Sequence, residues 1–177
     1  TGELKRTLTG HSNPVSSLVM SAKGDLVSGS QSDGIIKVWN VETGEVKRTL
    51  TGHSGGVYAL VISPKGDLVS GSCDKTIRVW NAETGQHIRT LSGHTGCIRS
   101  LVIGANEDLV SGSEDKTIRV WNVETGQLIR TLTGHTNPVY GLAISPNGEI
   151  VSGSDDYTIK VWNAETGALI RTLTGHT

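Results

Sequence analysis

Phenylalanine is absent from this sequence of 177 residues, and four tryptophans and three tyrosines supply all of its aromatic side chains. Apolar residues make up 35% of the chain, and no apolar run approaches the roughly 18 residues that a membrane helix needs. We therefore expect no membrane partner. Glycine is abundant, with 23 residues, and this composition favours many short strands and tight turns over a large helical core.

An excess of charge is also lacking, since 16 basic and 17 acidic residues leave a net charge of −1. No basic block stands out, so the electrostatic signature of a nucleic-acid-binding protein is missing. The only two cysteines, Cys73 and Cys97, do not indicate a disulfide framework, and no close-spaced ligand pair indicates a metal site. The sequence predicts no cofactor, and the lack of a disulfide framework, with no recognisable signal peptide, favours a cytoplasmic, reducing location.

The sequence repeats with a period of 41 residues. Gly-His pairs begin at residues 10, 52, 93, 134 and 175, and tryptophans stand at residues 39, 80, 121 and 162. Residues 52–92 and 93–133 align without a gap and are identical at 28 of 41 positions. The first unit is one residue longer, because GSQSDG stands where the second has GSCDK. We expect one repeat array over residues 1–177, with units at approximately residues 10–51, 52–92, 93–133 and 134–174.

Each unit is predicted to form four short antiparallel strands. In the second unit these are residues 57–63, which are mostly apolar and expected to be buried on both faces, followed by residues 67–72, 76–81 and 87–92. Glycine-containing turns of two to six residues separate them. Four-stranded sheets that repeat every 40–45 residues are typical of propeller blades around a central channel, so the predicted fold class is all-β.

The unit resembles a WD40 repeat. It has the opening Gly-His pair, the LVSGS strand followed by a turn with Asp, and a closing VWN in which Asn replaces the usual Asp. The resemblance covers essentially the whole chain. It implies a β-propeller whose members act as scaffolds for protein or peptide binding.

The resemblance also implies a buried hydrogen-bond network of one His, one Ser, one Asp and one Trp in each blade. Indole N–H is only a donor, a hydroxyl both accepts and donates, and imidazole can bridge the hydroxyl to a carboxylate. A neighbouring serine two residues further along each strand leaves the serine assignment open. The four predicted sets are His11, Ser28, Asp33 and Trp39; His53, Ser70, Asp74 and Trp80; His94, Ser111, Asp115 and Trp121; and His135, Ser152, Asp156 and Trp162.

The same residue types could instead form the triad of a hydrolase. The strand sequence is VSGS followed by one residue and Asp, which lacks the G-x-S-x-G pattern of an exposed nucleophile. Four equivalent active sites in near-identical units would also be unusual. We therefore expect a structural role for the network and no enzymatic activity, with a hydrolase as the alternative.

The few positions that differ between units are the best candidates for a binding surface. By resemblance they lie at the mouth of the channel, where Tyr and Arg are favoured anchors. Unselected drift between recently duplicated units is the alternative explanation. The predicted protein-binding residues are Ser16, Tyr58, Arg99 and Tyr140 on the inner strands and Ser32, Cys73, Glu114 and Asp155 before the network aspartates, with Pro14, Gly56, Cys97 and Pro138 nearby.

Four blades are fewer than the seven or eight of the usual WD40 ring. A half-ring would expose two blade faces, and apolar rows such as Val19, Val61, Ile103 and Ile144 would meet water. Two copies would supply eight blades with two-fold symmetry, so we expect a homodimer. A four-bladed monomer is the alternative.

Residues 3–8 repeat the sequence of an outer strand ahead of the first unit, so 17 predicted strands compete for 16 places. In the family, an N-terminal strand commonly completes the last blade as a clasp. In a dimer it could complete the last blade of the second copy, whereas a local hairpin has the lower loop-closure cost. The near-identical units and these ends also suggest a fragment of a longer propeller array.

Overall fold

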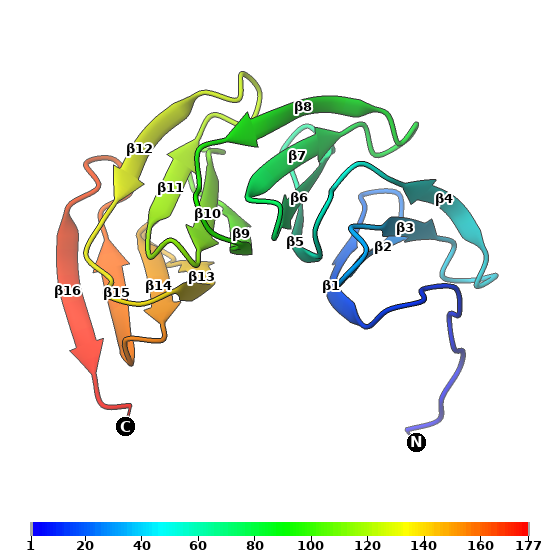
Figure 1. Cartoon of the computed structure of the whole chain (residues 1–177), viewed down its shortest axis with the longest axis horizontal. Coiled ribbons are helices and arrows are strands. Elements are labelled where there is room, and N and C mark those ends of the chain that lie inside the picture. Colours follow the sequence, from blue (N-terminus) through cyan, green and yellow to red (C-terminus); the bar gives the residue numbers. More distant parts are fainter. Residues whose placement is uncertain (1, 177) are drawn as a thin grey trace.

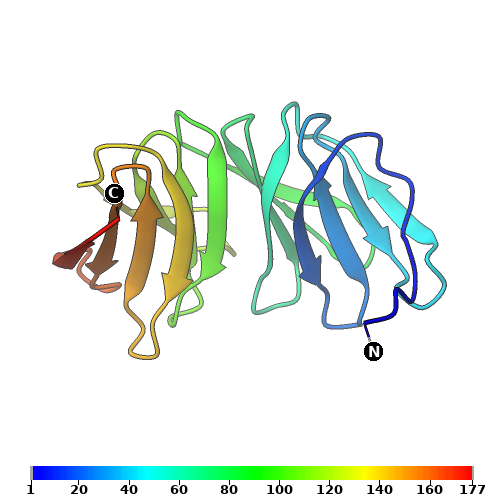
Figure 2. The same cartoon turned by 90° about the horizontal axis from the view of Figure 1, so that it is seen from below.

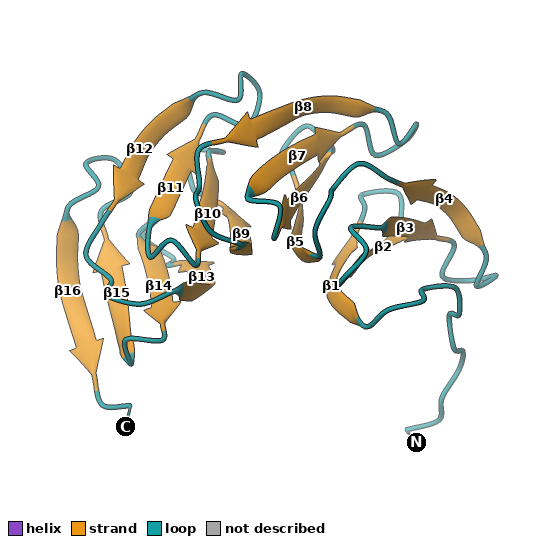
Figure 3. Cartoon of the chain, in the orientation of Figure 1, coloured by secondary structure: helices purple, strands orange, loops and turns teal. Residues whose placement is uncertain are grey.

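The computed structural model describes residues 2–176, and within this range it contains strands, turns and extended loops without any helix (Figure 3). Accordingly, the described chain offers no helix that could cross a membrane. Sixteen strands form four blades. Their bounds are β1 Val15–Met20, β2 Leu26–Ser30, β3 Ile36–Trp39 and β4 Val46–Leu50 in blade one; β5 Val57–Ile62, β6 Leu68–Ser72, β7 Thr76–Trp80 and β8 His87–Ser92 in blade two; β9 Ile98–Ile103, β10 Leu109–Ser113, β11 Ile118–Trp121 and β12 Leu128–Leu132 in blade three; and β13 Val139–Ile144, β14 Ile150–Ser154, β15 Thr158–Trp162 and β16 Leu169–Thr174 in blade four.

Each blade is an antiparallel sheet whose four strands follow one another in chain order. The predicted all-β fold is confirmed. Burial does not alternate strictly along β7, because Val79 and its neighbour Trp80 are both buried. The register between β7 and β8 shifts between these two residues, and such a bulge lets consecutive side chains reach the buried side of a sheet.

The four blades stand side by side along an arc (Figure 1). The first strands of the blades, β1, β5, β9 and β13, lie on the concave side, and the last strands, β4, β8, β12 and β16, lie on the convex side. The two chain ends lie at the two open ends of the arc. Figure 2 shows that the inner strands of the blades run roughly along one direction, so the turns at their two ends gather at two opposite rims.

The core lies between blades rather than within them. Three apolar clusters fill the three junctions, and the cluster between blades one and two contains Leu50, Val57, Leu68 and Trp80. The other two clusters repeat this arrangement between the following blades. A blade therefore needs a neighbour on each side to bury both of its faces.

The outer faces of blades one and four lack such neighbours. Their exposed side chains are not the predicted row: Val19 and Ile144 are half-buried, whereas Val15, Leu18 and Met20 of blade one are exposed. Val19 packs into the junction with blade two and Ile144 into the junction with blade three, so neither lies on an outer face. On blade four, Leu173 is exposed, whereas its equivalent Leu132 in blade three is buried.

The prediction of an outer strand at residues 3–8 is wrong for the single chain. The segment is extended and exposed but forms no strand. The physical reason is that a strand exists only by pairing with another, and the strand beside which this segment would lie belongs to a blade that would precede blade one.

Candidate functional site

The first strand of each blade begins at the same rim as the turn between the second and third strands. Backbone hydrogen bonds join the two: Cys73 N donates to Gly56 O over 2.9 Å, Glu114 N to Cys97 O over 2.9 Å, and Asp155 N to Pro138 O over 3.0 Å. Antiparallel pairing thus brings the predicted binding residues of blades two, three and four to one rim. We call this rim, with Ser16, Tyr58, Arg99, Tyr140, Cys73, Glu114 and Asp155, the channel-mouth face.

Blade one departs from the prediction by one residue. There it is Gln31, and not Ser32, whose N–H donates to the carbonyl of Pro14 over 2.9 Å. The extra residue of the first repeat lies after this point, so counting back from Asp33 selected the wrong side chain. The sequence equally allows counting forward from Ser28, which selects Gln31.

The centre of the channel-mouth face is an arginine between two tyrosines. The guanidinium carbon of Arg99 lies 4.0 Å from the ring centre of Tyr58 and 5.6 Å from that of Tyr140. Arg99 Nε also donates to Glu114 Oε1 over 2.9 Å. Burial alone would lower the pKa of Arg99, but hydrogen bonds to Glu114 and Tyr58 outweigh it and raise this pKa. The cation is therefore held by an aromatic face and a carboxylate together.

The two cysteines on this face form a disulfide, which corrects the expectation that they would not pair. Cys73 is in the β6–β7 turn of blade two and Cys97 precedes β9 of blade three, with their Cα atoms 3.9 Å apart. Their separation of 24 residues gave no signal of pairing. Pairing follows from the junction, which places this turn of one blade beside the first strand of the next. It also removes the cysteine argument for a reducing compartment, so a cytoplasmic location stays a prediction.

The polar quartets of blades two, three and four are closed hydrogen-bond networks. In blade two, His53 Nδ1 lies 2.7 Å from Asp74 Oδ2, His53 Nε2 lies 2.7 Å from Ser70 Oγ, and Trp80 Nε1 donates to Ser70 Oγ over 2.8 Å. A carboxylate only accepts, so Nδ1 carries the proton and Nε2 accepts from the hydroxyl. The equivalent contacts in blades three and four lie at 2.7–2.8 Å.

The quartet also explains why a glycine precedes the histidine in each unit. Gly52 has a φ of 148°, and a Cβ added to it would lie 3.2 Å from the indole of Trp80. A side chain here would meet both backbone strain and the ring. Glycine therefore lets the chain pass close to the tryptophan and deliver His53 to Ser70.

The network of blade one is open, so the predicted link between His11 and Asp33 is wrong. His11 Nε2 lies 2.6 Å from Ser28 Oγ, and Trp39 Nε1 donates to the same oxygen over 2.7 Å. Asp33 instead accepts from the side chain of Asn13 over 2.8 Å, and His11 Nδ1 has no partner among residues 2–176. The extra residue in the β2–β3 turn moves the carboxylate away from the imidazole.

The network aspartates are held as carboxylates. Burial alone would raise the pKa of Asp74, but hydrogen bonds from His53 and from the hydroxyl and amide of Thr76 outweigh it and keep this pKa well below its ordinary value. For Asp33, the same opposition between burial and hydrogen bonds leaves the pKa at about 2. The quartets of blades two, three and four are thus charged, bonded units that each join a loop to a turn.

The order Asp–His–Ser in these networks is that of a hydrolase triad, but the serine is inaccessible. Ser70, Ser111 and Ser152 are 0% exposed, and each hydroxyl accepts a hydrogen bond from a buried indole. A nucleophile must reach its substrate. The geometry therefore matches internal cross-linking and offers no open path to the hydroxyl.

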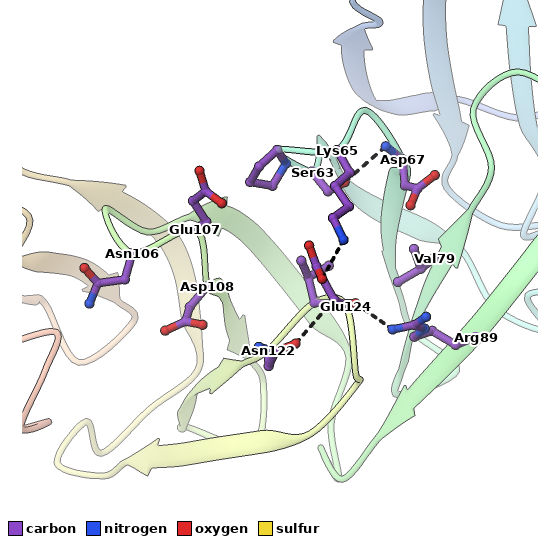
Figure 4. A pocket seen from close by; sticks show the side chains of 12 residues that line it. Ser63, Lys65, Asp67, Val79, Arg89, Asn106, Glu107, Asp108, Asn122 and Glu124 are labelled. Atoms are coloured by element: carbon purple, nitrogen blue, oxygen red, sulfur yellow. Dashed lines mark hydrogen bonds and ion pairs between the residues drawn. The ribbon is translucent and has the colours of Figure 1, made fainter.

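The rim opposite the channel-mouth face carries a polar cavity of about 440 Å³ between blades two and three (Figure 4). Lys65 of blade two reaches across it to Glu124 of blade three, with the charged atoms 2.6 Å apart, and Arg89 donates to the carbonyl of Val123 over 3.3 Å. Burial raises the pKa of Asp108 in its wall. No group of three or more potential metal ligands occurs among the described residues. The cavity is therefore best described as a bridged junction between blades.

Comparison with known proteins agrees with this architecture. No curated protein matches the chain. The family model described as "WD domain, G-beta repeat" matches residues 2–40, 44–81, 85–122 and 126–163. Each match begins at an outer-strand sequence and ends after the third strand of the following blade. Every match after the first therefore covers parts of two neighbouring blades. With four consecutive matches extending over most of its length, the chain belongs to the WD40 repeat family.

Proposed function

We propose that the chain is a non-catalytic scaffold that binds a protein or peptide through the channel-mouth face, and that two copies close into one eight-bladed ring. Repeats of the WD40 family generally act as protein-interaction scaffolds and are typically non-catalytic. One observation in particular supports the ring. The chain makes the same junction between blades three times internally, and each open end of the arc carries one of the two surfaces of such a junction.

The exposed side chains at the ends support this proposal. Val15 of blade one is 49% exposed, whereas its equivalents Val57, Ile98 and Val139 are 0% exposed because the preceding blade covers them. Leu173 of blade four is 47% exposed, whereas its equivalents Leu50, Leu91 and Leu132 are 2–4% exposed. Covering one such side chain stabilises the assembly by roughly 1.5–3 kcal/mol. Blade one of a second copy fits blade four as blade two fits blade one.

The glycine in the second strand of each blade also supports a junction between blade four and blade one of a second copy. At the three internal junctions, a Cβ added to this glycine would collide with the first strand of the next blade, at 2.8 Å for Gly29 and Val57, 2.5 Å for Gly71 and Ile98, and 2.9 Å for Gly112 and Val139. A Cβ added to Gly153 of blade four would meet nothing within 4 Å. Gly153 is therefore an empty place for Val15 of a second copy.

The segment before blade one supports the further proposal of a clasp. A Cβ added to Gly44 would lie 3.2 Å from Arg6 Cδ and 3.4 Å from Leu8 Cδ2. Arg48 and Leu50 of β4 surround Gly85 in the same way. Residues 3–8 thus already occupy the outer-strand position of an absent preceding blade. In a ring this position is that of β16 in the second copy, and we propose that residues 3–8 take it.

The substitution Gly153→Val separates the ring from the folding of the single chain. The new side chain enters open space in one chain but occupies the place of Val15 in the dimer. We expect light scattering to give twice the chain mass for the unmodified protein and one chain mass for Gly153→Val, with the circular dichroism spectrum unchanged. Adding Val15→Ala to Gly153→Val should restore part of the dimer. A single chain mass for the unmodified protein in dilute buffer would overturn the ring.

An esterase and protease assay tests the non-catalytic part of the proposal. We expect no turnover above that of buffer. Activity that disappears in Ser70→Ala, Ser111→Ala and Ser152→Ala variants would instead establish the hydrolase.

A further inference from the structure

The channel-mouth face contains one tyrosine whose ring is covered by an arginine of the following blade and an equivalent tyrosine that is exposed, and the first indicates the chemistry of a ligand for the second. In blade three, the side chain at the second position of the inner strand is Arg99. It stacks on Tyr58 of the preceding blade at 4.0 Å and is bonded to Glu114. An arginine side chain is thus bound by a tyrosine ring and a carboxylate within the protein itself.

The next tyrosine along the face has no such ligand on its outer side. Tyr140 of blade four is 44% exposed, and Arg99 lies 5.6 Å from its ring centre on the side of blade three. Tyr140 stands in blade four where Tyr58 stands in blade two. In the proposed ring, the residue that follows Tyr140 around the channel is Ser16 of the second copy, in the place that Arg99 occupies after Tyr58.

Ser16 leaves this place open. Its side chain is short, and its hydroxyl donates to the carbonyls of Gly29 and Val57, toward blade two of its own chain. Where blade three has a guanidinium group, the junction between copies therefore has space beside a tyrosine ring.

A carboxylate without a counter-ion lies on the same blade as the open tyrosine. In the occupied site Glu114 comes instead from the blade of the arginine, and its counterpart at the proposed junction is Gln31 of the second copy. Asp155 stands in blade four where Glu114 stands in blade three, and the contact between Glu114 and Arg99 shows that these two positions meet within a blade. Asp155 also stands where Cys73 stands, and the Cys73–Cys97 bond shows that this position reaches the first strand of the next blade. Asp155 is exposed, and within residues 2–176 no basic side chain forms an ion pair with it.

We propose that Tyr140 and Asp155, bounded by Ser16 of the second copy, form a site for an arginine side chain of a partner peptide, which stacks on Tyr140 as Arg99 stacks on Tyr58 and pairs with Asp155. The proposal rests on the proposed function and specifies its ligand. A ring contains two such sites, related by the two-fold axis. Arginine fits better than lysine because its planar group stacks on a ring while it donates to a carboxylate.

The test is a titration of the unmodified protein with the peptide acetyl-Gly-Arg-Gly-amide, followed by nuclear magnetic resonance of the backbone amides. The neutral control peptide carries citrulline in place of arginine, which keeps the shape and removes the charge. We expect saturable shifts at residues 140 and 155 with the arginine peptide only. Equal shifts with both peptides, or none at these residues, would overturn the site.

Three variants sharpen the test. Tyr140→Ala and Asp155→Asn should each weaken binding about five- to tenfold, because each removes one of the two attractions. Tyr157→Ala, at an exposed turn outside the site, should leave binding unchanged. Ser16→Arg should block the peptide by supplying a tethered arginine, as blade three does. Unchanged binding in Ser16→Arg would contradict the proposal.

The mass of each variant keeps this result apart from the fate of the ring. A dimer that ignores the arginine peptide overturns the site and leaves the ring intact. A monomer overturns the ring. If that monomer still binds the arginine peptide, and binding still depends on Tyr140 and Asp155, these two side chains form the site without Ser16.

Discussion

At the scale of single residues, the buried serine of each quartet is the branching point of the network. Ser70 Oγ accepts a hydrogen bond from the indole N–H of Trp80 and donates one to Nε2 of His53. Both Trp80 Nε1 and His53 Nε2 therefore have a partner. Asp74 completes the chain by accepting from His53, from Thr76 and from the amide of Ser54. Removing one member leaves several buried groups unsatisfied.

We expect Asp74→Ala to lower the free energy of unfolding by about 1–3 kcal/mol, because it leaves the buried Nδ1 of His53 and the donors around it unpaired. Asp33→Ala should cost less, since His11 makes no bond to Asp33. Urea unfolding of both variants measures the difference. Asp155→Ala, next to a network aspartate but exposed, is the control and should leave stability unchanged. Equal losses at residues 33 and 74 would contradict this explanation.

The resemblance to WD40 repeats implied the quartets, and the contacts in blades two, three and four agree with it. It failed in blade one, at His11 and at Ser32. One inserted residue changes which side chain faces which neighbour, and a sequence without an alignment does not say on which side of the insertion the register is kept. The contact of Gln31 with blade two therefore needed coordinates.

At the scale of elements, residues 2–11 and 44–53 give a direct comparison of sequence with surroundings. The two segments differ only at Leu4 and Val46, yet residues 46–50 form β4 and residues 3–8 form no strand. Their intrinsic preferences are nearly the same. The difference is that β4 pairs with β3, whereas residues 3–8 have no strand to pair with inside the chain. Sequence predicts where a strand can form, and pairing decides whether it does.

The disulfide links the strands and turns of one junction between blades. Cys73 and Cys97 connect blades two and three, and the other junctions carry Gln31 with Gly56 or Glu114 with Pro138 at the same places. Two further junction contacts are ion pairs, Lys65 with Glu124 and Lys23 with Glu83, which are exposed and add little to stability. The covalent bond is therefore the strongest specific link between any two blades.

We expect reduction of this bond by dithiothreitol to lower the free energy of unfolding by about 3 kcal/mol, because cross-linking restricts the unfolded chain between the two cysteines. The experiment compares thermal unfolding with and without dithiothreitol. A Cys73→Ser, Cys97→Ser variant is the control and should match the reduced protein in both conditions. If dithiothreitol lowers the melting temperature of the variant as well, the loss has another cause.

At the scale of the whole molecule, the two ends of the arc differ in shape, and the proposed ring would join them. Blade one offers Val15 as a projection, and blade four offers the empty place beside Gly153. A repeat with one turn angle per blade must either close or continue, and association of two identical arcs closes both junctions at once. Repeat number thus leads to the proposal of a second copy, whereas the exposed Val15 and the open space beside Gly153, which support it, are visible only in three dimensions.

The redundant outer strand gives the last prediction. If residues 3–8 of one copy complete blade four of the other, removal of residues 1–9 should weaken the dimer about tenfold or more, because each copy then loses a strand that it donates across the junction. Removal of residues 168–177, which include β16, should leave the dimer in place, since the donated strand can occupy the vacated edge of β15. If β16 keeps its place instead, the first truncation removes a competitor and tightens the dimer, whereas the second weakens it. Sedimentation equilibrium of the two truncated proteins over a range of concentrations distinguishes these opposite orders, and circular dichroism verifies that both remain folded.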